Sequence, residues 1–567
     1  MVGLSLFIRI AKPSNLVIMN KRSFHPLLVL VLVLATYQSK AQEFTRQDTL
    51  RGSIGEARDW WDLQHYDLSV ALDTVTRSIS GSNTITYLVK TPFDLMQIDL
   101  QTPMQITKVV QGKEVLEVTH DGNAHFVKLT ADQTIGSTQK LTVFYEGTPT
   151  VAARAPWDGG FTWAKDKNDN PFIATSNQGI GASLWWPCKD HPADEADQGM
   201  IMSFTVPSNL MAVGNGRLIK VQKGKGVKTF TWEVKNPIND YGVNLNVGDY
   251  VMFEEKYLGE KGQLDMTYYV LSYNLEKAKV HFKDARRTIE AFEHWFGPYP
   301  FYEDSYKLVE APYLGMEHQS SVTYGNGFEM GYRGRDLSMT GWGLKWDYII
   351  IHESGHEWFA NNITYKDVAD MWVHESFTCY SEALFVEYHY GKEAAAEYVR
   401  GMRYGIRNNS PMIGTYGVNQ EGADMYNKGS NVLHTLRQWI GNDEKWRGIL
   451  RGLNEEFYHQ TVTSAQIEAY IAEKSGLNLD KFFDQYLRDV RVPVLEYFVN
   501  NNKLLYRWTN CIDGFDMKVR VKIGEEEVEI APSASWNLKN AEIDAPPGSD
   551  IIVDQNYYIY SSLITGK

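Results

Sequence analysis

The sequence predicts a multidomain α+β protein in which a sheet-rich region, a mixed helical region and a short second sheet region follow one another. First, 567 residues are too many for one hydrophobic core. Second, apolar residues alternate with polar ones between about residues 60 and 250, recur at helical spacing between 275 and 488, and alternate again after Pro493. Third, 43% hydrophobic and 22% charged residues are typical of globular domains.

The N-terminus has the three-part pattern of a secretory signal. Residues 19–22 end in two basic residues, residues 27–35 form an apolar run too short to span a bilayer, and Ser39 and Ala41 offer the small side chains that cleavage needs. We therefore expect residues 1–41 to be a signal peptide with Met19 as the true start, and the mature protein to be periplasmic or secreted. An uncleaved membrane anchor is the alternative interpretation.

The first domain, expected over residues 42–255, is predicted to consist of strands. Residues 65–72 alternate polar and apolar, as in a half-buried strand, and similar runs recur at 84–89, 140–145 and 228–234. Gly, Asn and Asp clusters separate these runs, as turns require. No helical periodicity persists in this part of the chain.

The second domain, expected over residues 256–490, is predicted to be mixed but mainly helical. A helix over 275–295 precedes a strand over 306–311, and further helices are expected at 342–361, 370–390, 392–406, 427–440, 443–458, 464–474 and 479–488. Gly391, Gly441 and Gly476 stand where helix C-caps belong, and Thr463 and Ser464 are candidate N-caps.

The third domain, expected over residues 491–567, is predicted to be one small sandwich with strands at 494–499, 503–508, 517–523 and 527–530. The formal net charge of −14 argues against nucleic acid as a partner, since phosphate backbones repel an acidic surface. Three distant cysteines, Cys188, Cys379 and Cys511, make neither a zinc knuckle nor a disulfide framework; one bridge is open, but the sequence does not choose it.

The motif His352-Glu353-Ser354-Gly355-His356 carries the chemistry. It lies within an apolar run that predicts a buried helix. Four residues are about one helical turn, so both imidazoles leave the same face and are ready to bind zinc. Glu353 follows the first histidine and can reach a metal-bound water as a general base. By itself the pattern more often marks two core histidines.

A third ligand is expected from the next helix. Eighteen residues separate His356 from Glu375, which leaves room for a loop and an antiparallel return. A His-His-Glu set leaves the fourth position of a tetrahedral zinc for water. Glu382, further along the same helix, either supports a zinc histidine or forms a surface salt bridge.

These residues resemble the gluzincin aminopeptidases, whose members include aminopeptidase N and the leukotriene hydrolases, over most of the mature chain. Residues 352–359 are similar to the family's zinc helix, and residues 372–377 to its Trp-Leu-Asn-Glu-Gly-Phe segment, which implies Glu375 as the third ligand. The resemblance implies a saddle-like N-terminal sheet domain, a thermolysin-like catalytic domain and one Zn²⁺ per chain.

The resemblance also implies the substrate-binding residues. Gly315-Met316-Glu317-His318 resembles the family's Gly-x-Met-Glu-Asn strand, in which the glutamate binds the substrate's free amine. Tyr426 matches the tyrosine of Tyr-x-Lys-Gly, which donates to the transition-state oxyanion. Gln178 matches the residue that the sheet domain contributes to the site. Peptides with a free N-terminus are the implied substrates, and zinc, Glu353 and Tyr426 the implied hydrolytic machinery.

The sequence departs from the family in several places. His318 and His374 stand where Asn is usual, and Ser376 where Gly is usual. The chain as given also lacks the large helical C-terminal domain that covers the cavity in many relatives, so we expect a more open site. An endopeptidase or an epoxide hydrolase on the same scaffold, and a non-catalytic binding protein, are the alternative functions.

Overall fold

The computed structural model describes residues 43–538, 542–546 and 548–564. The predicted signal peptide lies outside these residues. The described chain begins with two short helices that the sequence did not predict, α1 (Arg46–Gly52) and α2 (Glu56–Asp59). Thr45 and Asp48 form a reciprocal capping box at the start of α1, which stabilises this short helix at its first turn.

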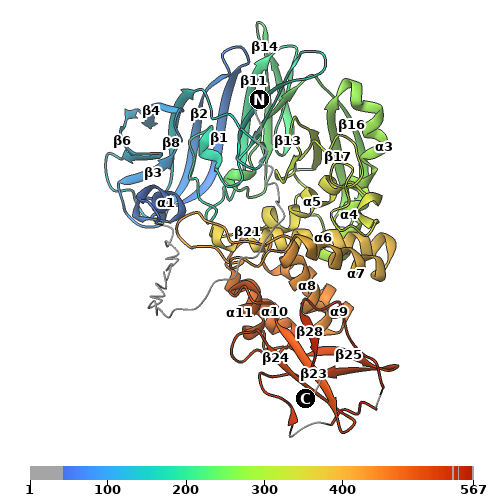
Figure 1. Cartoon of the computed structure of the whole chain (residues 1–567). Helices are drawn as coiled ribbons and strands as arrows, with labels where there is room; N and C mark the ends of the chain where they lie inside the picture. Colours follow the sequence, from blue (N-terminus) through green and yellow to red (C-terminus); the bar gives the residue numbers. More distant parts are fainter. Residues whose placement is uncertain (1–42, 539–541, 547, 565–567) are drawn as a thin grey trace, which may run out of the picture. The chain divides into compact units, whose positions relative to one another are not determined.

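An eight-stranded sheet dominates the N-terminal region, with the order β13-β14-β11-β1-β2-β8-β4-β5 (blue to teal in Figure 1). The predicted half-buried strand over residues 65–72 is confirmed in β1. Tyr66, Leu68 and Val70 are buried, and the side chains between them are not. The strands are β1 (Trp61–Asp73), β2 (Ser78–Val89), β4 (Gln105–Gln111), β5 (Glu114–Val115), β8 (Thr138–Gly147), β11 (Met200–Pro207), β13 (Arg217–Lys223) and β14 (Val227–Val234).

Two smaller sheets complete this region. One has the order β3-β7-β6 and the other β12-β15-β10-β9. Their strands are β3 (Leu95–Asp99), β6 (Glu117–Asp121), β7 (Ala124–Lys128), β9 (Gly160–Lys165), β10 (Pro171–Ser176), β12 (Met211–Val213) and β15 (Asn246–Gly248), with the 3-10 turns η1 (Ala182–Leu184) and η2 (Asp240–Gly242) nearby. Gln178 lies two residues beyond the end of β10.

A five-stranded sheet of order β16-β17-β18-β20-β19 opens the middle region. Its strands are β16 (Tyr250–Gly259), β17 (Gly262–Leu271), β18 (Tyr306–Glu310), β19 (Gly315–Met316) and β20 (Val322–Tyr324). The predicted boundary between residues 255 and 256 therefore falls inside β16, which pairs with β17 along its whole length. Glu317 follows the edge strand β19.

The helices of the middle region pack on one hydrophobic core (green to orange in Figure 1). They are α3 (Leu275–His281), α4 (Lys283–Phe296), α5 (Tyr348–Gly355), α6 (Trp372–Tyr390), α7 (Lys392–Gly401), α8 (Asn427–Ile440), α9 (Asp443–Glu456), α10 (Ser464–Ser475) and α11 (Asp480–Leu487). Short turns and a two-stranded ladder join them: η3 (Ser272–Asn274), η4 (Trp342–Lys345), η5 (Glu357–Asn362), η6 (Val368–Asp370), η7 (Met402–Gly405), β21 (Ile363–Tyr365) and β22 (Gln460–Val462).

Most predicted helix ends are confirmed. Gly391, Gly441 and Gly476 are C-caps with positive φ, and Thr463 forms a capping box with Gln466. Three predicted helices are wrong as single elements. The 275–295 helix is divided between α3 and α4, the 342–361 segment becomes η4, α5 and the π-turn η5, and the 392–406 segment becomes α7 and the 3-10 turn η7.

Two three-stranded sheets form the C-terminal region, with the orders β24-β23-β28 and β26-β25-β27. The strands are β23 (Val494–Asn500), β24 (Lys503–Thr509), β25 (Val519–Ile523), β26 (Glu526–Ile530), β27 (Ile551–Val553) and β28 (Tyr560–Leu563). Within the described residues no helix combines the length and apolar character needed to cross a bilayer. The three cysteines, all of them described, are unpaired.

Candidate metal centre and active site

Helix α5 presents both motif histidines. Asp347 caps its first turn by accepting from the backbone N–H groups of Ile349 and Ile350, and isoleucines bury the helix in the core. His352 lies in the last turn of α5 and His356 is its C-cap. Their rings lie 5.0 Å apart and nearly perpendicular, so both face one small volume.

Glu375 on α6 reaches the same volume. Its Oε2 atom lies 3.8 Å from Nε2 of His352 and 3.5 Å from Nε2 of His356. This buried oxygen has no hydrogen-bond partner among the described residues. A buried carboxylate oxygen without a donor is costly, so the arrangement calls for a cation.

The opposite edge of each imidazole is held by an acceptor. Nδ1 of His352 lies 2.8 Å from Oε1 of Glu382, and Nδ1 of His356 lies 3.1 Å from the carbonyl oxygen of Phe359. A carboxylate and a carbonyl can only accept here, so each Nδ1 carries a proton and each Nε2 is the nitrogen left to bind a metal. The His-His-Glu set therefore fits a zinc ion. Glu382 is buried and bonded to His352 rather than engaged in a surface salt bridge.

Charge around this volume shifts the pKa values of its groups. Burial lowers the pKa of His352, but the hydrogen bond to Glu382 and the nearby carboxylates outweigh this and raise it to about 9. Burial, followed by the neighbouring His352, lowers the pKa of His356 well below its usual value. The two histidines thus differ because one faces a carboxylate and the other a neutral carbonyl.

Two more carboxylates face the metal-binding set. Glu353 and Glu317 are both buried, and one oxygen of each lies within 4.8 Å of a His356 ring nitrogen. Burial raises the pKa of Glu353 to about 7, and burial with the charges of Glu353 and Glu375 raises that of Glu317 well above its usual range. Gly315 allows this approach, because a Cβ there would lie 2.9 Å from Oε1 of Glu353.

Gln178 joins the site from the N-terminal region. Its amide donates to Oε1 of Glu317 at 2.8 Å and to Oε1 of Glu375 at 3.2 Å. The neighbouring Met316 is buried on β19, where it packs against Tyr241 and Tyr313. One side chain from a distant sheet therefore links the candidate amine-binding carboxylate to the candidate ligand.

Tyr426 stands at the start of α8 with 41% of its surface exposed. It nevertheless lines the same cavity as Glu375, and burial, followed by the charge of this carboxylate, raises the pKa of its hydroxyl well above the usual value. Its ring lies 6.3 Å from that of His352. All nine residues predicted for the site are thus placed in or beside one volume.

The two unusual histidines hydrogen-bond to neighbouring strands, His318 to a side chain and His374 to the backbone. Nδ1 of His318 lies 2.8 Å from the hydroxyl of Thr323, and burial lowers the pKa of this histidine to about 3. Nε2 of His374 accepts from the backbone N–H of Tyr365 at 2.9 Å, and the two rings stack at 4.0 Å. Both rings are neutral supports of the strands that flank the site.

The sequence did not single out the rest of the cavity wall. A cavity of about 150 Å³ contains the predicted residues and is also lined by Pro156, Trp157, Leu314, Tyr332, Tyr348 and Ile349. Trp157 is 59% exposed and lies in a loop before β9. No local pattern marks it, because it joins the cavity wall only after the chain has folded.

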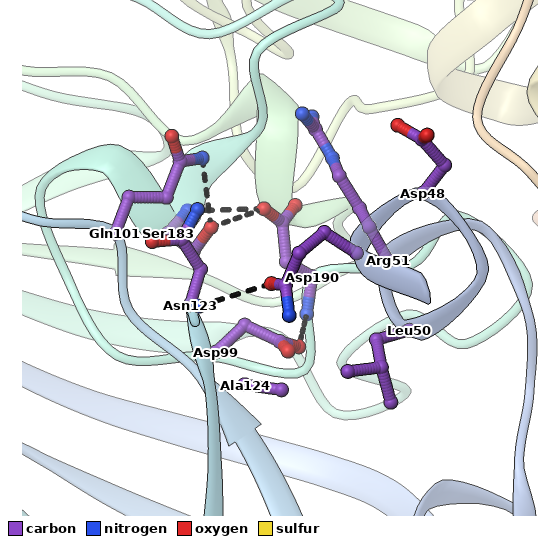
Figure 2. A pocket seen from close by; sticks show the side chains of 10 residues that line it. Asp48, Leu50, Arg51, Asp99, Gln101, Asn123, Ala124, Ser183 and Asp190 are labelled. Carbon is purple, nitrogen blue, oxygen red and sulfur yellow. Dashed lines mark hydrogen bonds between the residues drawn. The ribbon is translucent and has the colours of Figure 1, made fainter. Parts of the chain in front are cut away.

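A second cavity, of about 170 Å³, lies beside α1 (Figure 2). Its acidic groups are bonded within the protein: Asp99 pairs with Arg58, and Asp190 accepts from the hydroxyl of Ser183. Arg51 donates to the carbonyl oxygen of Gly179 at 2.6 Å. This region therefore supports the loop that carries Gln178.

Comparison with known proteins identifies the class. Residues 63–241 match the Peptidase M1 N-terminal domain and residues 280–486 match the Peptidase family M1 domain. These matches cover more than half of the chain, which belongs to peptidase family M1.

The chain is also similar to curated relatives, and it shares its fold with solved structures. Tricorn protease-interacting factor F2 of Thermoplasma acidophilum is 23% identical over 59% of this chain and 43% of its own length. Aminopeptidase N of Lactobacillus delbrueckii subsp. lactis is 24% identical over 78% of this chain and 52% of its own. The chain thus spans about half the length of these curated relatives. The M1 zinc metallopeptidase of Deinococcus radiodurans has a similar fold, with a TM-score of 0.65 and 21% identity over 76% of this chain and 95% of that one.

Proposed function

We propose that this protein is a zinc-dependent aminopeptidase that removes N-terminal residues from peptides. One observation carries the proposal: the Gln178 amide bridges Glu317 and Glu375. A buried carboxylate beside the metal-binding set selects a cationic N-terminus and fixes the distance from that amine to the first peptide bond. The names of the relatives, which include aminopeptidases, support the same activity.

The ligands in this proposal are His352, His356 and Glu375, which hold one zinc ion per chain. When bound, zinc supplies Lewis-acid polarisation of the scissile carbonyl and makes a water molecule more acidic. Among the described residues, Oε2 of Glu375 has no hydrogen-bond partner, which supports its role as a ligand.

The protein side chains supply proton transfer, oxyanion stabilisation and binding of the substrate amine. Glu353 accepts the proton of the attacking water and returns it to the leaving amine. The Tyr426 hydroxyl donates to the oxyanion that develops on the substrate carbonyl. Glu317, together with Gln178, holds the free amine, and Gly315 and Met316 shape the strand beside the peptide.

Matched peptides with free and N-acetylated termini test this proposal. We expect the purified protein to release single N-terminal residues from the free peptides, to leave the blocked ones intact, and to lose activity with a chelator and regain it with zinc. Cleavage of blocked peptides at internal bonds would replace the proposal with an endopeptidase. Hydrolysis of an epoxide without peptide cleavage would replace it with an epoxide hydrolase.

We further propose three domains, with the first boundary moved to residues 249/250 and the second kept at 490/491. The full pairing of β16 with β17 supports the shift. Limited proteolysis followed by mass spectrometry tests both positions, and cuts confined to other loops would contradict them.

We also propose export after cleavage at residue 41, on the strength of the basic, apolar and small-residue pattern of residues 19–41. N-terminal sequencing of the protein from cell fractions tests this. A cytoplasmic protein that retains these residues would contradict it.

A further inference from the structure

Ser376, next to Glu375 on α6, makes a buried hydrogen bond to a different part of the site. Its hydroxyl donates to the carbonyl oxygen of Met425 at 2.7 Å. A serine hydroxyl carries one proton, and its other neighbour, the sulfur of Met412 at 3.7 Å, is a weak acceptor. The proton therefore goes to Met425.

The accepting carbonyl belongs to the peptide unit that precedes Tyr426. Tyr426 is the N-cap of α8, and its own carbonyl accepts from the backbone N–H of Ser430 at 3.0 Å. The carbonyl of Met425 lies outside the helical ladder and needs another donor, because Met425 is buried. Since a peptide unit is planar, fixing this carbonyl also fixes the backbone N–H of Tyr426. Hydrogen bonds from Ser376 and Ser430 thus fix the peptide units on both sides of Tyr426.

The packing of α6 against α8 leaves Ser376 little freedom. A Cβ added at Gly429, in the first turn of α8, would lie 1.9 Å from the Ser376 hydroxyl oxygen and 2.4 Å from its Cβ. Glycine is therefore required where α8 crosses this serine. Ser376 follows Glu375 in the chain, so one short segment of α6 places both the carboxylate and the support of the tyrosine that lines the same cavity.

We propose that Ser376 is a positioning residue for Tyr426: through the Met425 carbonyl it sets the direction in which the tyrosine hydroxyl enters the site. This inference rests on the proposed oxyanion role of Tyr426. Ser376 touches no substrate in this account. Loss of the Ser376 hydroxyl should displace the Tyr426 hydroxyl slightly. This should slow the chemical step and leave substrate binding nearly unchanged.

A double-mutant cycle of Ser376→Ala and Tyr426→Phe tests the inference, with Ser381→Ala as the matched control. Ser381 is also buried on α6, and its hydroxyl donates to the carbonyl oxygen of Thr378 at 2.6 Å. For each variant, kcat and KM are measured on a free-amine amino-acid 4-nitroanilide, together with zinc content and thermal unfolding.

We expect Ser376→Ala to lower kcat by about 10- to 100-fold with KM and zinc content nearly unchanged. In the Tyr426→Phe background the same change should add less than about a twofold loss, because no hydroxyl remains to be positioned. Ser381→Ala should lower the unfolding temperature and keep kcat.

Three outcomes would overturn the inference and leave the proposed function intact. They are kcat losses that multiply in the double variant, an effect of Ser376→Ala on KM alone, and an equal kcat loss in Ser381→Ala. Normal turnover by Tyr426→Phe would overturn both. Crystal structures of the wild type and Ser376→Ala provide a readout independent of activity. The hydroxyl of Tyr426 should shift relative to His352, Glu353 and Glu375 in the variant, and an unmoved tyrosine would overturn the inference.

Discussion

Nδ1 of His352 lies 2.8 Å from Oε1 of Glu382, and Nε2, across the ring, faces Glu375. The other oxygen of Glu382 accepts from the hydroxyl of Tyr398 at 2.6 Å. This chain of hydrogen bonds orients the imidazole before any metal binds, and a preset ligand loses less freedom on binding.

Replacing this carboxylate should therefore weaken zinc binding. We expect Glu382→Ala to raise the zinc Kd by about 10- to 100-fold, measured by competition with a chromogenic chelator. Tyr398→Phe, which keeps the carboxylate and removes its donor, should act in the same direction with a smaller effect. An unchanged Kd in both variants would show that His352 needs no such support.

Glu353→Gln separates metal binding from proton transfer. The amide is nearly isosteric but cannot accept the water proton, so we expect normal zinc content and a loss of kcat by at least about 10²- to 10⁴-fold. Steady-state kinetics and metal analysis of the same preparation check this. A variant that loses zinc along with activity would instead place Glu353 among the ligands.

Glu317→Ala addresses the selection of a free amine. Without this carboxylate the substrate ammonium loses its charge partner, so kcat/KM for free-amine peptides should fall by about 10²-fold or more. Any residual cleavage of N-acetylated peptides should be unaffected. Equal losses on both substrate types would remove Glu317 from amine recognition.

The pH dependence of stability should include a contribution from Glu195, which lies away from the metal-binding set. Burial raises its pKa to about 7, and the hydroxyl of Thr364 donates to it at 2.6 Å. The folded state therefore binds a proton more tightly than the unfolded chain, whose glutamate pKa is about 4.5. This contribution to stability is present below about pH 4.5 and is lost as the pH rises to about 7.

Glu195→Gln removes this titration. Relative to the variant, the wild type should lose as much as about 3 kcal/mol of unfolding free energy between pH 4.5 and pH 8, measured by urea unfolding. Parallel pH profiles for the two proteins would contradict the assignment.

Local patterns were enough to predict much of the helical region. The predicted span 427–440 coincides with α8, because an apolar periodicity ends at Gly441, where an αL conformation favours glycine. The predicted span 342–361 failed because Phe359 and Ala360 leave helical geometry, with φ values of −125° and 156°. Packing decides that break, and nothing in the apolar run itself signals it.

His352 and His356 share one helix face because four residues close one helical turn whatever surrounds them, so spacing alone is enough to predict this pair and the position of Glu375 on the next helix. Which atoms meet depends on the packed fold. Gln178 and Trp157 come from a sheet region more than a hundred residues away, and Ser376 reaches Met425 because Gly429 lets two helices touch. The physical reason is that periodicity is a short-range property of the backbone, whereas these contacts depend on how separate elements pack, which no local spacing encodes.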